Sequence, residues 1–127
     1  YVRQLNEAGI RTSLFIDPDP VQVAVAEALK APVIELHTGA YCAAIERDAS
    51  EAARELAALQ NAAKEGAARG LEIHAGHGIT FESVTPIAAI PELAELNIGH
   101  FLVGEAIFTG LAHSVSEMRR LMDEARA

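Results

Sequence analysis

The segment Leu71-Glu72-Ile73-His74-Ala75-Gly76-His77-Gly78 decides the fold class that this sequence predicts. Residues 71–75 form a short apolar, strand-forming run, and the Gly-His-Gly after them cannot continue a regular strand. Directly before this run, a long helix is predicted at about residues 48–69, because its apolar residues recur on one face and Gly70 fits a C-terminal cap. A helix followed by a short apolar strand and a glycine-rich loop is typical of α/β folds.

Three more strand–helix units are predicted around this segment. Their strands are short apolar runs between turn-forming residues, expected at residues 11–16, 33–37 and 100–103. Gly99 directly precedes the last of these strands, and Gly104 directly follows it. Strands that alternate with helices predict a parallel sheet with right-handed crossovers.

Apolar periodicity predicts the remaining helices. The helix after the first strand is expected to begin at Asp19 as its N-cap and to bury Val21, Val25 and Leu29. Residues around Tyr41 and Cys42 are expected to form a connection, and shorter helical pieces are expected at residues 84–89, 91–94 and 106–109. The final helix is expected to open with a capping box from Ser114 to Glu117 and to bury Val115, Met118, Leu121, Met122 and Ala125.

Two architectures fit this order, an open doubly wound sheet and a section of a (β/α)8 barrel. No G-x-G-x-x-G motif follows the first strand, which argues against a dinucleotide-binding doubly wound domain. Four units are half of a barrel, and Val2, Leu5 and Ala8 before Gly9 indicate the last turns of a helix that begins outside the sequence. We therefore expect residues 1–127 to be the second, C-terminal half of one TIM-barrel domain, with its edge strands covered by the other half or by another copy.

Composition limits the classes of partner. The formal net charge of −8 argues against binding nucleic acid or an anionic membrane through a positive field, and no apolar run approaches the ~20 residues of a membrane span. A single cysteine, Cys42, excludes an intrachain disulfide and favours a reducing cytoplasm. A small phosphate ligand remains compatible with the charge, because backbone N–H groups at a helix N-terminus bind phosphate.

Four of the five histidines lie within or beside a predicted strand, at positions 37, 74, 77 and 100. His77 stands between two glycines, where it can donate or accept a proton near neutral pH, although the same position suits a histidine that only caps a loop. The backbone N–H groups of Gly99, His100 and Gly104 are candidates for phosphate binding. Close packing of the turns and a buried core histidine are the alternative explanations.

Glu35 lies inside an apolar strand and shares a face with His37 if the side chains alternate. A buried carboxylate is costly unless it is paired, so Glu35 is either a group that reaches the substrate in the barrel lumen or part of a structural ion pair. A metal centre is the competing chemistry, because His37, His74, His77 and Glu35 offer suitable ligand atoms. However, there is no H-E-x-x-H motif, and His74 and His77 are spaced across a strand end where side chains need not converge.

A series of motifs runs in order through nearly the whole chain. They are Ser13-Leu14-Phe15-Ile16-Asp17, Ile34-Glu35-Leu36-His37-Thr38-Gly39, Ala75-Gly76-His77-Gly78, Ile87-Ala88-Ala89-Ile90-Pro91-Glu92, Glu95-Leu96-Asn97-Ile98-Gly99-His100 and Glu117-Met118-x-Arg120-Leu121-Met122. Any one tripeptide is weak, but the ordered set resembles the second half of the pyridoxine 5′-phosphate synthase family.

The resemblance implies units five to eight of a (β/α)8 barrel in an enzyme that condenses 3-amino-2-oxopropyl phosphate with 1-deoxy-D-xylulose 5-phosphate. The products are pyridoxine 5′-phosphate, phosphate and water. It implies His77 as the proton donor, Glu35 as the group that stabilises the transition state, and Gly78, Gly99 and His100 as contacts of the amino-oxopropyl phosphate. It implies no metal or organic cofactor, and a homo-oligomer of whole barrels, often an octamer. The family's basic histidine and glutamate, and the arginines that contact the sugar phosphate, belong to the first half of the barrel.

Two positions depart from the family pattern. His74 stands where an asparagine is expected, and Glu105 follows Gly104 where some members carry a basic residue. Two other functions stay open. One is a non-enzymatic half-barrel that binds a phosphorylated ligand at Gly99-His100 or assembles with itself, and the other is a metal-dependent hydrolase.

Overall fold

A computed structural model describes residues 1–127 and has a four-stranded parallel sheet at its centre. Its strands are β1 (Ser13–Ile16), β2 (Val33–His37), β3 (Glu72–Gly76) and β4 (Leu93–Asn97). The strand order β1-β2-β3-β4 follows the chain without a reversal, whereas a doubly wound sheet reverses its order at a switch point. The chain therefore forms half of a (β/α)8 barrel, as the sequence predicts.

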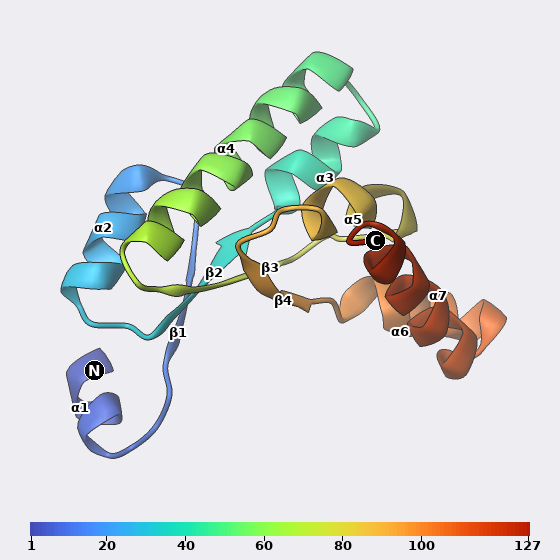
Figure 1. The fold of residues 1–127 in the computed structure, drawn as a ribbon. Helices are drawn as coiled ribbons and strands as arrows, with labels where there is room; N and C mark the ends of the chain where they lie inside the picture. Colours follow the sequence, from blue (N-terminus) through green and yellow to red (C-terminus); the bar gives the residue numbers. More distant parts are fainter.

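Seven helices connect and flank the strands (Figure 1). They are α1 (Val2–Glu7), α2 (Pro20–Ala28), α3 (Gly39–Ile45), α4 (Ala49–Ala68), α5 (Phe81–Ala88), α6 (His100–Thr109) and α7 (Leu111–Glu124). Figure 1 shows α2, α4 and α3 along one face of the sheet, and α6 and α7 beyond the end of β4. None of these helices has both the length and the apolar character that crossing a membrane requires.

Alternation along β2 separates the two faces of the sheet. Ile34 and Leu36 are fully buried on the helical side, whereas Glu35 and His37 lie half-buried on the other side. The long helix α4 packs so closely on the sheet at Gly66 that a Cβ atom there would lie 2.7 Å from Cδ1 of Ile73. The apolar side therefore forms the core, and the polar side faces the barrel interior.

The fourth strand does not lie where the sequence predicts it. β4 comprises Leu93–Asn97, and residues 100–103 form the first turn of α6, so the helical piece predicted at residues 91–94 is also wrong. The register gives the reason. Leu96 pairs with Ala75, so β4 ends level with β3, and a strand at residues 100–103 would lie beyond the end of the sheet. A short apolar run by itself does not distinguish a strand from a buried helix.

The final helix begins earlier than its predicted capping box. α7 starts at Leu111, and Ser114 is its fourth residue, which is fully buried and donates a hydrogen bond to the carbonyl oxygen of Leu102. Val115, predicted to be buried, is 48% exposed. The rest of the predicted stripe is confirmed, because Met118 is buried and Leu121, Met122 and Ala125 pack against the core.

The face of α2 that is buried in the structure is not the face that the sequence predicts. α2 lies at the outer edge of the helical layer beside α4 (Figure 1), so α4 and the sheet cover only the face that carries Val23 and Ala26. The residues left exposed are Val21, Val25 and Leu29. The connection predicted around Tyr41 is instead the short helix α3, which buries Tyr41 and Ala44.

Candidate functional site

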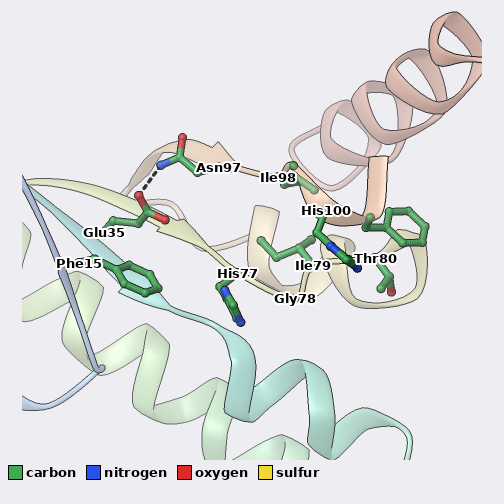
Figure 2. Close-up of a pocket in the computed structure, with 11 residues that line it drawn as sticks. Phe15, Glu35, His77, Gly78, Ile79, Thr80, Asn97, Ile98 and His100 are labelled. Carbon is green, nitrogen blue, oxygen red and sulfur yellow. Dashed lines mark hydrogen bonds between the residues drawn. The ribbon is translucent and has the colours of Figure 1, made fainter. Parts of the chain in front are cut away.

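A cavity of about 670 Å³ opens at the carboxyl ends of the strands. It brings together the five residues to which the family resemblance assigns roles, which are Glu35, His77, Gly78, Gly99 and His100. These residues come from β2, from the β3–α5 loop and from the start of α6. In the view of Figure 2, His77 lies between Glu35 on one side and His100 on the other. Phe15, Ile79, Thr80, Asn97, Ile98 and Phe101 complete the lining.

Glu35 is held by Asn97, a residue to which sequence reasoning assigned no role. The Asn97 side-chain amide donates a hydrogen bond of 2.8 Å to Glu35 Oε2 (Figure 2). The bond passes over Gly76 of the intervening strand, where a Cβ atom would collide with Glu35 Oε1 and lie 2.7 Å from the Asn97 carbonyl oxygen. Glu35 therefore has a neutral amide partner and is not part of the structural ion pair considered from the sequence.

His77 has an uncommon backbone conformation, with a φ of 82°, and Gly78 follows with a φ of 80°. A positive φ costs a residue with a side chain on the order of 1 kcal/mol, so surrounding contacts must hold it. The His77 ring packs against His37, with 4.8 Å between the ring centroids, and Phe15 packs edge-on against His37 at 5.1 Å. These contacts hold the His77 ring where it lines the cavity.

The start of α6 forms the other end of the cavity. Gly99 is the N-cap residue, and the first helical hydrogen bond runs from the Val103 N–H to the Gly99 carbonyl oxygen. The N–H groups of His100, Phe101 and Leu102 therefore have no partner within the helix, and no acidic residue lies in its first turn. This end carries the positive pole of the helix dipole, which favours an anion.

The correction to β4 changes two expectations about this end. Gly104 and Glu105 lie inside α6 and do not line the cavity. The Gly104 N–H is therefore not available to a phosphate, contrary to the expectation from the sequence. For the same reason, the Glu105 carboxylate does not add negative charge to the cavity wall.

His74 does not line the cavity and instead contacts two carboxylates. Its Nε2 atom lies 2.7 Å from Glu72 Oε1 and its Nδ1 atom 3.5 Å from Glu95 Oε1. The hydrogen bond from His74 and the ion pair with Arg11 lower the pKa of Glu72 below its ordinary range. At the position where the family pattern has an asparagine, His74 thus lies between the carboxylates of Glu72 and Glu95.

The four side chains that a metal centre would need do not converge. Glu35 bonds Asn97, His74 bonds Glu72 and lies 3.5 Å from a Glu95 carboxylate oxygen, and His37 packs against His77. No group of three or more His, Cys, Asp or Glu side chains is arranged to hold a metal ion. The geometry therefore gives no support to the metal-dependent hydrolase.

Cys42 lies on α3 below Gly78. Its Sγ atom lies 3.6 Å from the Ser83 hydroxyl oxygen, and burial raises the pKa of the thiol. A raised pKa keeps Cys42 as a thiol and makes it a weak nucleophile, so packing is the better account of this side chain.

Comparison with known proteins assigns the family. Residues 1–124 match the family described as pyridoxal phosphate biosynthesis protein PdxJ. The chain belongs to this family. The PdxJ relatives include proteins named pyridoxine 5′-phosphate synthase from Zymomonas mobilis subsp. mobilis, at 57% identity over 99% of the chain, and from Ruegeria pomeroyi, at 56% identity over 100%.

A third such relative, from Rhodospirillum rubrum, is 55% identical over 98% of the chain. The chain covers 48%, 52% and 49% of these three relatives respectively, so it spans about half the length of the PdxJ proteins that it matches. This agrees with the half-barrel of the structure.

Proposed function

We propose that this chain is the C-terminal half of a pyridoxine 5′-phosphate synthase. The complete protein would condense 3-amino-2-oxopropyl phosphate with 1-deoxy-D-xylulose 5-phosphate, and release pyridoxine 5′-phosphate, phosphate and water. The observation that carries the proposal is the single cavity that holds Glu35, His77, Gly78, Gly99 and His100. PdxJ family membership and the names of the relatives support it.

His77 is assigned the role of proton donor. Ring closure from two phosphorylated ketones needs repeated proton transfers and the elimination of water and phosphate. The hydroxyl that leaves as water must be protonated, and an imidazole supplies protons near neutral pH. His77 lines the cavity between the carboxylate of Glu35 and the start of α6.

Glu35 is assigned the stabilisation of positive charge. An amine that condenses with a ketone passes through a protonated imine, and a preorganised carboxylate beside that nitrogen stabilises it. The bond from Asn97 holds one carboxylate oxygen in place before substrate binds. A fixed carboxylate loses less free energy to reorganisation than a mobile one.

The phosphate of 3-amino-2-oxopropyl phosphate is assigned to the start of α6. The free N–H groups after Gly99 and the His100 side chain supply donors, and Gly78 lets the loop approach the ligand closely. This explains how a chain with a net charge of −8 would bind an anion.

The complete protein is the proposed enzyme. The family resemblance assigns the basic histidine and glutamate, and the sugar-phosphate arginines, to the other half of the barrel, so the 127 residues alone are expected to be inactive. The proposal includes no metal or organic cofactor, a cytoplasmic location, small phosphorylated substrates as the only non-protein partners, and a homo-oligomer of barrels. It includes no nucleic-acid or membrane partner.

The proposal is tested by supplying both substrates to the complete protein and detecting pyridoxine 5′-phosphate by chromatography. His77→Asn is expected to lose most turnover while keeping the wild-type circular dichroism spectrum. His113→Asn, at an exposed position of α7, is the matched control and keeps full turnover. Absence of product from the wild-type protein, or near-normal turnover in His77→Asn, contradicts the assignment.

A non-catalytic phosphate-binding protein is the second candidate. The observation in its favour is that this chain contains the helix start that would bind phosphate, whereas the family's basic residues lie outside it. It predicts that phosphate binds at Gly99-His100, measured by calorimetry, and that no product forms when both substrates are present.

A further inference from the structure

Thr38 bonds the backbone on both sides of His77. Its side chain is fully buried at the junction of β2 and α3. The hydroxyl oxygen lies 2.8 Å from the Gly76 carbonyl oxygen and 2.6 Å from the His77 carbonyl oxygen, and the Thr38 N–H donates to the Gly76 carbonyl at 2.9 Å. One residue therefore anchors the two peptide units that meet at the His77 Cα atom.

These anchors define the direction of the His77 side chain. The φ angle of His77 depends on the peptide unit that carries the Gly76 carbonyl, and its ψ angle depends on the unit that carries its own carbonyl. The hydroxyl has one proton and donates to one carbonyl at a time. Because the Thr38 N–H already bonds the Gly76 carbonyl, the hydroxyl is the donor left for the His77 carbonyl. With both carbonyls bonded in this way, His77 stays at its φ of 82° although that region is unfavourable for a residue with a side chain. Without the hydroxyl, the peptide unit after His77 loses its bond to Thr38, and the loop and the His77 ring are free to shift.

The hydroxyl is not needed to cap α3. A threonine at the N-cap position usually accepts a hydrogen bond from the first turn of its own helix. Thr38 occupies that position in α3 but makes no such bond, and its hydroxyl faces the end of β3 instead. Helix stability therefore does not account for this side chain.

The next residue leaves space for the ring. A Cβ atom on Gly39 would lie 2.8 Å from Cε1 of His37 and 3.2 Å from Cδ2 of His77, closer than ordinary van der Waals contact. Thr38 thus bonds the His77 backbone, and Gly39 leaves room for the imidazole rings of His77 and His37.

We propose that Thr38 is a positioning residue, which holds His77 in the conformation from which it donates a proton. The expected effect on kcat rests on the proposed synthase function. The expected effect on the His77 conformation rests on geometry alone. Thr38 contacts no substrate in this scheme, and it acts only through the backbone of His77.

The kinetic test uses Thr38→Val in the complete protein, because valine keeps the shape and removes the hydroxyl. We expect kcat to fall roughly 10- to 100-fold, as for a catalytic group displaced by about 1 Å, with KM for both substrates changed less than about twofold. Thr38→Ser restores the hydroxyl and is expected to recover most of kcat. Thr12→Val removes another buried, hydrogen-bonded threonine hydroxyl, before β1, and is expected to keep wild-type kcat.

Wild-type kcat in Thr38→Val, or a Thr38→Ser variant as slow as Thr38→Val, overturns the proposal. If Thr38→Val folds poorly, Thr38→Ala removes the same hydroxyl without added bulk and carries the same expectation. A crystal structure of the variant separates this proposal from the proposed function. A wild-type protein that forms no product refutes the synthase, whereas a variant in which the His77 backbone and ring both keep their wild-type conformation refutes the role of Thr38.

Discussion

The Ser114 hydroxyl in α7 donates a hydrogen bond to the Leu102 carbonyl oxygen in α6, with 3.0 Å between the two oxygens. Ser114 is fully buried, so water does not compete for this bond. The bond is made to the first turn of α6, and that turn lines the cavity. α7 therefore helps to fix the helix end that we assign to phosphate binding.

Ser114→Ala is expected to lower the free energy of unfolding of the complete protein by about 1 kcal/mol, because a buried hydrogen bond is lost. Chemical denaturation measures the change. Ser116→Ala is the control, since Ser116 is exposed and bonds only within its own helix, and it is expected to change the same quantity by less than about 0.5 kcal/mol. Equal effects of the two variants contradict a special role for Ser114.

Asn97→Leu is expected to lower kcat roughly tenfold, because Glu35 loses the 2.8 Å bond that holds its carboxylate. Steady-state kinetics of the complete protein check this. Asn6→Leu removes an asparagine that donates to the Lys30 carbonyl, and should leave kcat unchanged. Unchanged turnover in Asn97→Leu means that Glu35 does not need its partner.

His100→Asp is expected to raise KM for 3-amino-2-oxopropyl phosphate roughly tenfold or more, since it replaces a donor and adds negative charge to the first turn of α6. Ser116→Asp adds the same charge to an exposed position of α7 and is expected to leave KM unchanged. Equal KM values in the two variants would show that the phosphate does not bind at this helix end.

Asp48 is expected to make stability depend on pH. The N–H groups of Glu51 and Ser50 bond its carboxylate at the start of α4 and lower its pKa below the ordinary 3.8. The folded-state pKa is the lower one, so this stabilisation is present above 3.8 and is lost as the pH falls through the folded-state value. Asp48→Ala should therefore lower Tm at neutral pH and converge with the wild type in acid. A Tm difference that does not depend on pH contradicts the prediction.

The first three strands could be predicted because local signals coincide at their ends. Asp17-Pro18, Thr38-Gly39 and Gly76 each interrupt a short apolar run, and the structure ends β1, β2 and β3 at these points. No turn signal marks the end of β4 in the same way, since apolar residues continue past Gly99 into a helix. Only pairing with β3 selects residues 93–97 as the strand, and register is a tertiary property that a single sequence does not display.

The candidate site could be predicted in part for a related reason. His77, Gly78, Gly99 and His100 follow strand ends or glycines, which mark ligand loops in parallel sheets. The sequence alone does not indicate Asn97 and Thr38, because each acts on a residue that is far away in the chain and adjacent only in the folded sheet. Alternation would place Asn97 on the lumen side of β4, but only once the position of β4 is known.

The bond between Glu35 and Asn97 joins residues separated by 62 positions along the chain. The ribosome therefore synthesises Glu35 well before Asn97. The segments α4, β3 and α5 are made between β2 and β4, so β4 joins the sheet after them. Contacts of such separation form late, because closing the intervening loop costs entropy that only later packing offsets. A partly synthesised chain thus carries Glu35 without the amide that orients it, and this half of the site is completed only when the sheet is.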